Sequence, residues 1–557
     1  LQNMKRTTTI ILFAGIAAGI AACNKSLDKL PLNEPSSDSF YKSAAEVDMG
    51  LQGCYKSLNW ELKSTRPWPV MLDNITDVSW NRSAHAVQEL GNGTATSANT
   101  SSETAYTQCY KSIGRVNFLL ENIDRAKDLI SEAYYKQVIA EARWVRAFNY
   151  MLLTELFGDV PLVTEMLTLE SPILAKTPKA EVVTFILKEL DESAPDLMAT
   201  NVGITGRATR VAAYALKARV ALFNAQWQVA ADAANAARAI GKYGLYENYG
   251  NLFNYTGEAC KEQIFSLQYL KGIISHSNSN FLSSRLAGGV ANEVPTQQMI
   301  DSYECTDGQT IDKSPLFNPS KPFLNRDPRL AMSIALPGST YYGYQFETHP
   351  DSLKVWNYNV TPATRVPNTD ATNVYATFTG YMWRKWSDIK DMKDDENCDG
   401  DIVLFRYAEL LLIYAEAKIE ANQIDESVYK ALDSIRVRAG MPIVQRGQTQ
   451  SYMRTLVRRE RKVELANEGL RLFDIRRWKI GEKVMKGPRY GRSRTTWLTS
   501  APTLDENSTP DYSTVSNASV MRVIENMVFN PKRDYLWPIP TSEIQTTKGV
   551  ITQNDNW

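Results

Sequence analysis

The chain has 557 residues, and its 62 lysines and arginines balance 62 aspartates and glutamates. This balance gives no overall basic footprint, so neither nucleic acid nor an anionic membrane surface is expected as a partner through charge. Aromatic residues are abundant instead, with 12 Trp, 27 Tyr and 17 Phe, many of them in polar stretches.

A short apolar segment near the start of the chain predicts export. Residues 10–22 are too few for the roughly 20 of a transmembrane helix but fit the hydrophobic region of a signal peptide. The segment ends in small residues directly before Cys23, as in a bacterial lipobox. We expect a signal peptide over residues 1–22, lipidation of Cys23 and a flexible tether over residues 23–39. The alternative is an ordinary secretory signal followed by an unmodified cysteine.

The cysteines after Cys23 do not indicate a disulfide framework. They lack CxxC spacing, and their odd number prevents complete pairing. We expect most of them to be buried small hydrophobes. They are Cys54, Cys109, Cys260, Cys305 and Cys398.

The next part of the chain, from residue 40 to about 270, shows the periodicity of amphipathic helices. A first helix is expected over residues 43–58, and residues 113–120 lead to a long helical region from residue 131. Within residues 141–157, Trp144 and Phe148 lie on one face, and the following Gly-Asp-Val-Pro ends the helix.

Paired helices are predicted on both sides of a less regular stretch. Residues 208–223 and 227–240 form an alanine-rich hairpin that resembles one tetratricopeptide unit. Residues 405–421 and 425–439 form a second hairpin, and residues 452–472 a further helical segment. Their uneven spacing along the chain does not fit a regular solenoid.

Two regions, residues 271–401 and 486–520, lack helical periods and are rich in Gly, Ser, Thr, Asn, Pro and aromatics. Loops this long are uncommon in compact domains and are usually functional. We therefore predict a mostly α fold in which residues 40–557 form one unit. Its helical scaffold, over about 40–270 and 402–485, carries an irregular, loop-rich ligand face.

Several ordered segments of the chain resemble the SusD/RagB-like nutrient-binding lipoproteins of Bacteroidetes. Besides the lipobox cysteine, they are residues 33–58, 141–163, 208–223, 327–330, 405–418, 435–442, 456–478 and 535–545. The resemblance implies tetratricopeptide-like helix pairs that scaffold the ligand face. It also implies a lipid-anchored protein on the extracellular face of the outer membrane, which delivers nutrient to a TonB-dependent SusC-like transporter.

No arrangement of residues predicts catalysis, and we expect no enzyme. The three histidines, His85, His276 and His349, are scattered, and nucleotide-binding and hydrolase motifs are absent. Glu460, Glu464 and Glu468 follow i, i+4, i+8 spacing, but nearby arginines explain them more simply as salt-bridge partners. A surface glycosidase or peptidase is an alternative from another class, and a purely structural subunit that binds no ligand is a third.

One turn resembles the start of a calcium-binding loop. Asp395, Asn397, Asp399 and Gly400 match its opening residues, but Arg406 stands where a bidentate acid is required. Only a weak or differently completed calcium site is possible there, and a polar turn is the simpler interpretation. No other cofactor is expected.

Polar aromatic clusters predict where a ligand binds. Sugars offer hydroxyl groups and apolar faces, so their sites combine aromatic rings with Asp, Asn and Arg side chains. Such residues gather in segments 73–82 and 338–358, and we expect the ligand residues to be exposed. The candidates are Asp73, Trp80, Asn81, Arg82, Tyr341, Tyr344 and Trp356.

Other interpretations of these clusters stay open at this point. The aromatic rings of the two segments can instead pack the loops together. Trp383 and Trp386 lie in a strand-like stretch and are expected in the core. A glycan is the expected ligand, and a peptide is the main alternative.

Overall fold

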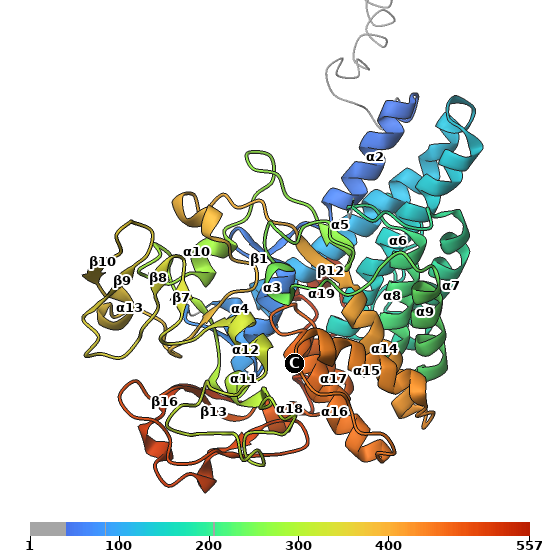
Figure 1. Ribbon diagram of the computed structural model, residues 1–557. Coiled ribbons are helices and arrows are strands. Elements are labelled where there is room, and N and C mark those ends of the chain that lie inside the picture. The colour runs from blue at the N-terminus through green and yellow to red at the C-terminus, as the bar shows by residue number, and fades with distance from the viewer. Residues whose placement is uncertain (1–39, 84, 204–205) are drawn as a thin grey trace, which may run out of the picture.

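The computed structural model describes residues 40–83, 85–203 and 206–557 (Figure 1). The predicted signal peptide, the lipobox cysteine Cys23 and the tether lie outside the described residues. In the described part, no helix is both long and apolar enough to cross a membrane.

Long helices form the first part of the scaffold: α2 (Ala44–Lys56), α5 (Thr100–Asn122), α6 (Glu132–Phe157) and α7 (Lys179–Ser193). The side chains of Ser43, Asn99 and Ser131 accept backbone N–H bonds in the first turns of α2, α5 and α6, which fixes where these helices begin. Helix α6 ends at Gly158, whose φ of +78° is accessible to glycine at little cost. The helix predicted over residues 141–157 and its end at the following glycine are confirmed.

Later helices continue the scaffold. They are α8 (Arg210–Phe223), α9 (Trp227–Ala239), α14 (Tyr407–Glu420), α15 (Glu426–Arg438), α16 (Gln450–Glu464), α17 (Arg471–Arg477) and α18 (Gly481–Val484). Helices α8, α9, α14 and α15 stack beside the first group on the right of Figure 1, and α16–α18 lie below them toward its centre. Helix α9 packs against both α8 and α14, although α14 lies far along the chain. Its buried Ala230, Ala234 and Ala237 allow this close approach. Both predicted hairpins are confirmed.

The helix expected over residues 452–472 is interrupted, so that prediction is wrong in extent. Helix α16 ends at Glu464, and α17 begins only at Arg471. Between them Asn467 and Gly469 have positive φ, which an α-helix does not allow. A Cβ at Gly469 would stand 2.4 Å from the Pro69 carbonyl oxygen, so close packing also requires glycine there.

Short helices and strands fill the remaining segments. The helices are α3 (Trp68–Leu72), α4 (Ala86–Asn92), α10 (Asn278–Leu282), α11 (Gln297–Ser302), α12 (Pro328–Ser333), α13 (Thr369–Thr372) and α19 (Thr541–Thr546). Six strand pairs are antiparallel: β1 (Glu61–Lys63) with β2 (Arg66–Pro67), β3 (Ser79–Asn81) with β5 (Glu293–Pro295), β4 (Gln263–Leu267) with β12 (Ile402–Arg406), β6 (Ile334–Ala335) with β11 (Met382–Trp383), β13 (Gly487–Gly491) with β16 (Arg522–Met527), and β14 (Thr503–Leu504) with β15 (Pro510–Asp511).

One four-stranded sheet stands apart from the long helices, on the left of Figure 1, with the short α13 beside it. It contains β7 (Thr340–Tyr341), β8 (Tyr344–Gln345), β9 (Lys354–Asn357) and β10 (Thr364–Pro367). Like the rest of residues 271–401 and 486–520, it holds only short elements joined by loops. The predicted mostly α fold with helix pairs and a loop-rich side is confirmed.

The main hydrophobic core includes residues from Tyr41 to Ile551. At its centre Trp144 of α6 contacts Phe265 of β4, with ring centres 4.6 Å apart. Of the five cysteines after Cys23, all are unpaired, and four are buried as expected; Cys260 is partly exposed. Trp383 and Trp386 also lie in this core, as predicted.

Residues 535–557 close this core against the early helices. The backbone N–H of Trp537 donates to the Leu156 carbonyl at 2.7 Å, at the end of α6. The Ser102 hydroxyl of α5 donates to the Pro538 carbonyl, also at 2.7 Å. The chain therefore returns to its first helices after passing through every other element.

Candidate functional site

The carboxylates that could have indicated an enzyme are neutralised by arginines. Glu460 and Glu464 lie on α16, while Glu468 follows the helix end, so the three do not share one helix face. The Arg406 guanidinium lies 2.7 Å from Glu464 and 2.7 Å from Glu468, and Arg329 lies 2.5 Å from Glu460. The salt-bridge interpretation of these glutamates is confirmed.

The electrostatics of Glu464 fit a structural role. Burial alone would raise its pKa, but Arg438, Arg406 and Arg329 outweigh burial and hold the pKa well below its usual range. Both carboxylate oxygens accept from arginines, and the side chain is inaccessible to solvent. This network, which we call the buried charge network, contains Arg329, Arg406, Arg436, Arg438, Lys385, Glu262, Glu304, Asp327, Glu460, Glu464 and Glu468.

The expectation that Asp73 and Asn81 are exposed is wrong. Both are fully buried. An Asp73 carboxylate oxygen accepts from the Arg471 backbone N–H at 3.3 Å, and burial raises the Asp73 pKa to about 7. The Asn81 side chain accepts from Ser83 and from Asn292, which joins the loops after β3 and before β5. The polar side chains of both residues therefore bond to other parts of the chain inside the protein.

Trp80 and Tyr341 are also buried, which corrects the expectation that they form exposed stacking platforms. Trp80 is 5% exposed, and its ring stacks on Phe378 with centres 5.7 Å apart. Its indole N–H donates to Glu525 at 2.8 Å. The Tyr341 hydroxyl donates to the Trp383 carbonyl at 2.9 Å. Since their polar atoms already have partners, these rings support the loops from inside.

The two predicted segments nevertheless meet. Trp80 and Tyr341 belong to one small hydrophobic cluster, separate from the main core, and Phe378 packs against it. The loop-rich side of the molecule therefore has its own core. Trp80 and Tyr341, which the sequence indicated as ligand platforms, are members of that core.

Above this cluster lies a set of arginines and aromatic rings. Tyr375 is 59% exposed, and the guanidiniums of Arg82 and Arg285 lie 5.3 Å and 5.8 Å from its ring centre. The Arg522 guanidinium lies 4.0 Å from the centre of the Phe378 ring, on the cluster that holds Trp80. We call this region the arginine surface; it contains Arg82, Arg285, Arg492, Arg494, Arg522, Tyr375 and Phe378.

Five separate segments supply the arginine surface. Its members follow β3, α10, α13 and β13, or begin β16. The Arg492 N–H donates to the Thr379 carbonyl at 3.0 Å, which joins the end of β13 to the aromatic loop. Gly380 has a φ of +83°, and a Cβ there would stand 2.6 Å from Arg492 Cγ. Glycine is thus needed for Arg492 to lie across this loop.

Burial and mutual repulsion affect the charges of the arginine surface. Burial lowers the pKa of Arg82, and Arg285 lowers it further. The Arg494 pKa falls to about 10, through burial first and then through Arg522 and Arg492. All stay charged at neutral pH, so the surface presents concentrated positive charge beside an exposed ring.

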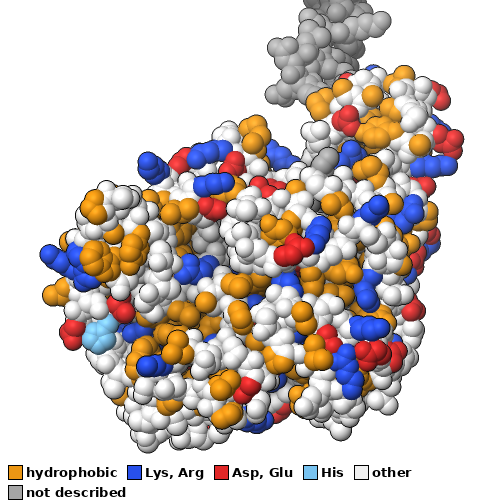
Figure 2. Space-filling view, viewed as in Figure 1, with side chains coloured by type: hydrophobic (Ala, Val, Ile, Leu, Met, Phe, Trp, Pro, Cys, Tyr) orange, Lys and Arg blue, Asp and Glu red, His pale blue; other side chains and the backbone are white. Residues whose placement is uncertain are grey.

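Trp356 occupies a different exposed position, on β9. It is 40% exposed, and the Arg365 guanidinium of β10 lies 5.2 Å from its ring centre. Tyr344 of β8 is half-buried. Hydrophobic and basic side chains gather at this end of the molecule (Figure 2). The exposure expected of Trp356 is confirmed, and its contact with a ligand stays a prediction.

Sequence reasoning found Arg82 but missed the other members of the arginine surface. Tyr375 and Phe378 stand in a Thr- and Asn-rich stretch, which is the composition already used to select Trp80. Arg492 and Arg494 alternate in a Gly-Arg-Ser-Arg stretch. No local signal reveals that these segments converge.

The calcium candidates point to different partners. Asp395 accepts from Asn280, Asn397 donates to Asp394, and Asp399 accepts from the Tyr255 hydroxyl and the Lys271 N–H. Across the part of the chain that the structure describes, no group of three or more His, Cys, Asp or Glu residues is placed to hold a metal ion. Calcium binding at this turn stays a prediction.

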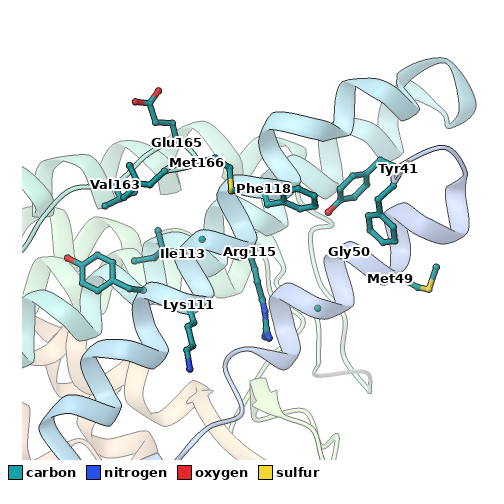
Figure 3. A pocket seen from close by; sticks show the side chains of 15 residues that line it. Tyr41, Met49, Gly50, Lys111, Ile113, Arg115, Phe118, Val163, Glu165 and Met166 are labelled. Carbon is teal, nitrogen blue, oxygen red and sulfur yellow. The ribbon is translucent and has the colours of Figure 1, made fainter. Parts of the chain in front are cut away.

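An apolar groove of about 640 Å³ lies beside α2 (Figure 3), which is at the top of Figure 1 while β13 and β16 are at the bottom. Tyr41, Met49 and Phe118 line one part of it, and Val163 and Met166 of the loop after α6 line another. Met49 and Met166 are exposed. Its lining is mostly apolar, which suits contact with protein or lipid better than with a sugar.

Two family models match the chain. Residues 261–557 match the SusD family, and residues 25–222 match a family described as starch-binding and associating with the outer membrane. SusD-like protein P2 of Formosa agariphila is 26% identical, over 98% of this chain and 99% of its own length. The starch-binding protein SusD of Bacteroides thetaiotaomicron is 23% identical over 45% of this chain and 48% of its own.

Solved structures share the fold. A SusD-like carbohydrate-binding protein of Bacteroides fragilis superposes with a TM-score of 0.78 at 27% identity, covering 92% of this chain and 99% of its own. Surface glycan-binding protein A of Bacteroides uniformis has a TM-score of 0.67 at 18% identity, with coverage of 92% and 99%. The second likeness concerns the fold alone.

Proposed function

The chain belongs to the SusD family, and on that premise we propose that it is a non-catalytic, lipid-anchored protein of the outer-membrane surface. It binds an oligo- or polysaccharide and delivers it to a TonB-dependent, SusC-like transporter. The carbohydrate-binding description of its relative from Bacteroides fragilis supports the ligand class.

The observation that carries this proposal is the arginine surface. The Tyr375 ring is exposed on a chain that otherwise buries most of its large aromatics. An aromatic ring stacks against the apolar face of a sugar, and guanidiniums beside it donate to hydroxyl oxygens. The guanidiniums of Arg82 and Arg285 contact this ring and also donate to the Tyr375 carbonyl, so a ligand meets a preformed surface.

Capture without catalysis agrees with the state of the acidic residues. A glycosidase needs two carboxylates roughly 5–10 Å apart that can reach the sugar. Glu460, Glu464 and Glu468 are buried and ion-paired, so they supply neither acid nor base to a ligand at the surface.

Titration calorimetry against a panel of polysaccharides tests capture. We expect binding by the wild type and a loss of more than about tenfold for Tyr375→Ala, since a stacking anchor is often worth ~2 kcal/mol. Tyr452→Ala is the matched control, because Tyr452 is similarly exposed but lies on α16. Products that accumulate on long incubation would contradict the non-catalytic proposal, and tight binding of peptides alone would favour peptide capture.

The anchor and the partner need separate tests. Fatty-acid labelling should mark the wild type and not Cys23→Ala.

A globule without a pore imports nothing by itself, so we expect a SusC-like barrel to co-purify from mild detergent. The apolar groove beside α2 is a candidate contact for it, because Phe40 and Tyr41, the first residues that the structure describes, line that groove. A lipoprotein that purifies alone under several gentle conditions would contradict delivery to a transporter.

A further inference from the structure

The guanidiniums of the arginine surface have no carboxylate partners. Arg82 and Arg285 both donate to the Tyr375 carbonyl, Arg494 donates to the Thr377 carbonyl, and Arg492 donates to the Ser493 carbonyl. Within residues 40–83, 85–203 and 206–557, none of the five arginines forms an ion pair. Elsewhere in the same chain most buried arginines do.

Part of this hydrogen-bonding capacity is unused although it is shielded from bulk water. Arg492 is only 5% exposed, yet its Nη1 has no acceptor, and the Nε of Arg494 has none either. Burying a charged donor without a partner costs free energy, so such groups are normally paired. Here two neighbouring arginines of one surface each leave a buried donor unpaired.

Nearby acids do not neutralise the surface. Glu525 already accepts from Trp80, Gln88 and Asn92. Asp370 accepts from the Leu286 N–H. Asp370 and Glu347 act on the arginines only at longer range: they raise the pKa of Arg285 and of Arg492, but by less than burial lowers it. No carboxylate forms an ion pair with the surface in the described residues, so its guanidiniums are available to a ligand.

We propose that the arginine surface selects acidic glycans, whose carboxylate or sulfate groups bind the guanidiniums while a sugar ring stacks on Tyr375. This inference rests on the proposed capture of a polysaccharide and names its class. Guanidinium pairs with planar carboxylates and with sulfate oxygens through two parallel N–H bonds. Several arginines around one exposed ring suit a polymer with repeated charges.

The surroundings favour an acidic glycan over the other polyanions. Charge-driven binding of nucleic acid or an anionic membrane uses an overall basic protein, whereas this chain is balanced at 62 basic and 62 acidic residues. The guanidiniums are also fixed by backbone carbonyls rather than extended into solvent. Fixed donors beside a ring recognise a defined unit.

The test compares acidic polysaccharides with their neutral counterparts, by calorimetry on the soluble protein at two salt concentrations. Polygalacturonate and its carboxyl-reduced form are one pair, and a sulfated galactan and its desulfated form are the other. We expect at least one acidic form to bind about tenfold or more tighter than its counterpart, with affinity falling as salt rises. The pair that shows the difference identifies carboxylate or sulfate.

Variants place the effect on the surface. The double variant Arg82→Ala/Arg522→Ala should lose most of the preference for the acidic form, and Arg285→Ala alone should lose part of it. Arg446→Ala is the control matched to Arg285→Ala, since it also removes one charge, from an exposed arginine paired with Glu426 and Asp433. Thermal melting of each variant verifies that the protein is folded.

Each contrary outcome has a different meaning. If no polysaccharide binds, the proposed function itself fails. If neutral and acidic forms bind equally, capture stands and the acidic-glycan inference is overturned. It is also overturned if Arg446→Ala weakens binding as much as the double variant. Equal or tighter binding of single-stranded DNA, or of vesicles with anionic lipid, through the same arginines would overturn it in favour of those ligands.

Discussion

Arginines serve two regions of this chain in opposite surroundings. In the buried charge network, Arg329 and Arg406 each contact several carboxylates, which occupy their N–H donors. In the arginine surface, Arg82 and Arg494 contact only backbone carbonyls and rings, and donors stay unused. The residue type is the same in both.

The partner, not the residue, decides what an arginine does. Where carboxylates complete the hydrogen bonding, removing one member leaves a buried charge unpaired and should cost stability. In the arginine surface no carboxylate completes the hydrogen bonding. Removing an arginine there relieves repulsion between like charges, so it should lower the affinity for the ligand and not the stability of the protein. Stability and affinity measurements on variants of both regions therefore test the comparison directly.

The largest effect is expected in the buried charge network. Glu464→Ala leaves Arg406, Arg438 and Arg329 without their shared carboxylate, so the free energy of unfolding should fall by about 3–5 kcal/mol. Denaturant unfolding measures it. A loss below about 1 kcal/mol would mean that water replaces the carboxylate and that the network is not structural.

A second stability effect distinguishes the layer beneath the arginine surface from the surface itself. Trp80→Ala should cost about 3 kcal/mol, because it opens a cavity under Phe378 and leaves Glu525 without the indole donor. Arg82→Ala, two residues away, should change stability by less than about 0.5 kcal/mol. Equal losses for both would place Arg82 in the core as well.

The buried carboxyl group of Asp73 should make the stability of the protein depend on pH. Its folded-state pKa is about 7, above the unfolded value, so the folded protein binds the proton more tightly. Its contribution to stability is therefore full below about pH 4 and declines as pH rises toward 7, by about 2 kcal/mol or more. Asp73→Asn cannot ionise and should flatten this part of the pH–stability curve; an unchanged curve would show that Asp73 does not cause it.

The smallest stability effect should come from Trp356→Ala. Its ring is 40% exposed, so the free energy of unfolding should change by less than about 0.5 kcal/mol, in contrast to the larger loss expected for Trp80→Ala. If the bound polymer reaches β9, affinity should fall, but by less than for Tyr375→Ala. A large loss of stability would instead make Trp356 part of the packing of the β7–β10 sheet.

The helices were predictable because their signal is local. Helices such as α6, α8 and α14 carry long runs of apolar periodicity and clear end signals. The β7–β10 sheet was not predictable, because strands of two to four residues are too short to show an alternation of apolar and polar residues. The sequence does not predict the break between α16 and α17. Glycine is required at position 469 by close packing against Pro69, which lies some 400 residues away along the chain.

The candidate site was predictable only in part, for a related reason. Asp73, Trp80 and Asn81 were chosen because polar and aromatic residues adjoin there, but their partners lie in distant segments, as Arg471 and Glu525 do. Polarity in sequence does not tell whether a partner is solvent, ligand or another part of the chain. The arginine surface likewise exists only once five segments meet.

The return of residues 535–557 to α5 and α6 affects how the protein reaches its folded form. These residues are synthesised after every helix that they cover, and bonds such as Trp537 to Leu156 join positions far apart in the chain. Contacts of such long range slow folding, because the loop entropy must be lost before they form. A nascent chain thus keeps the surfaces of α5 and α6 uncovered until its last residues have been synthesised.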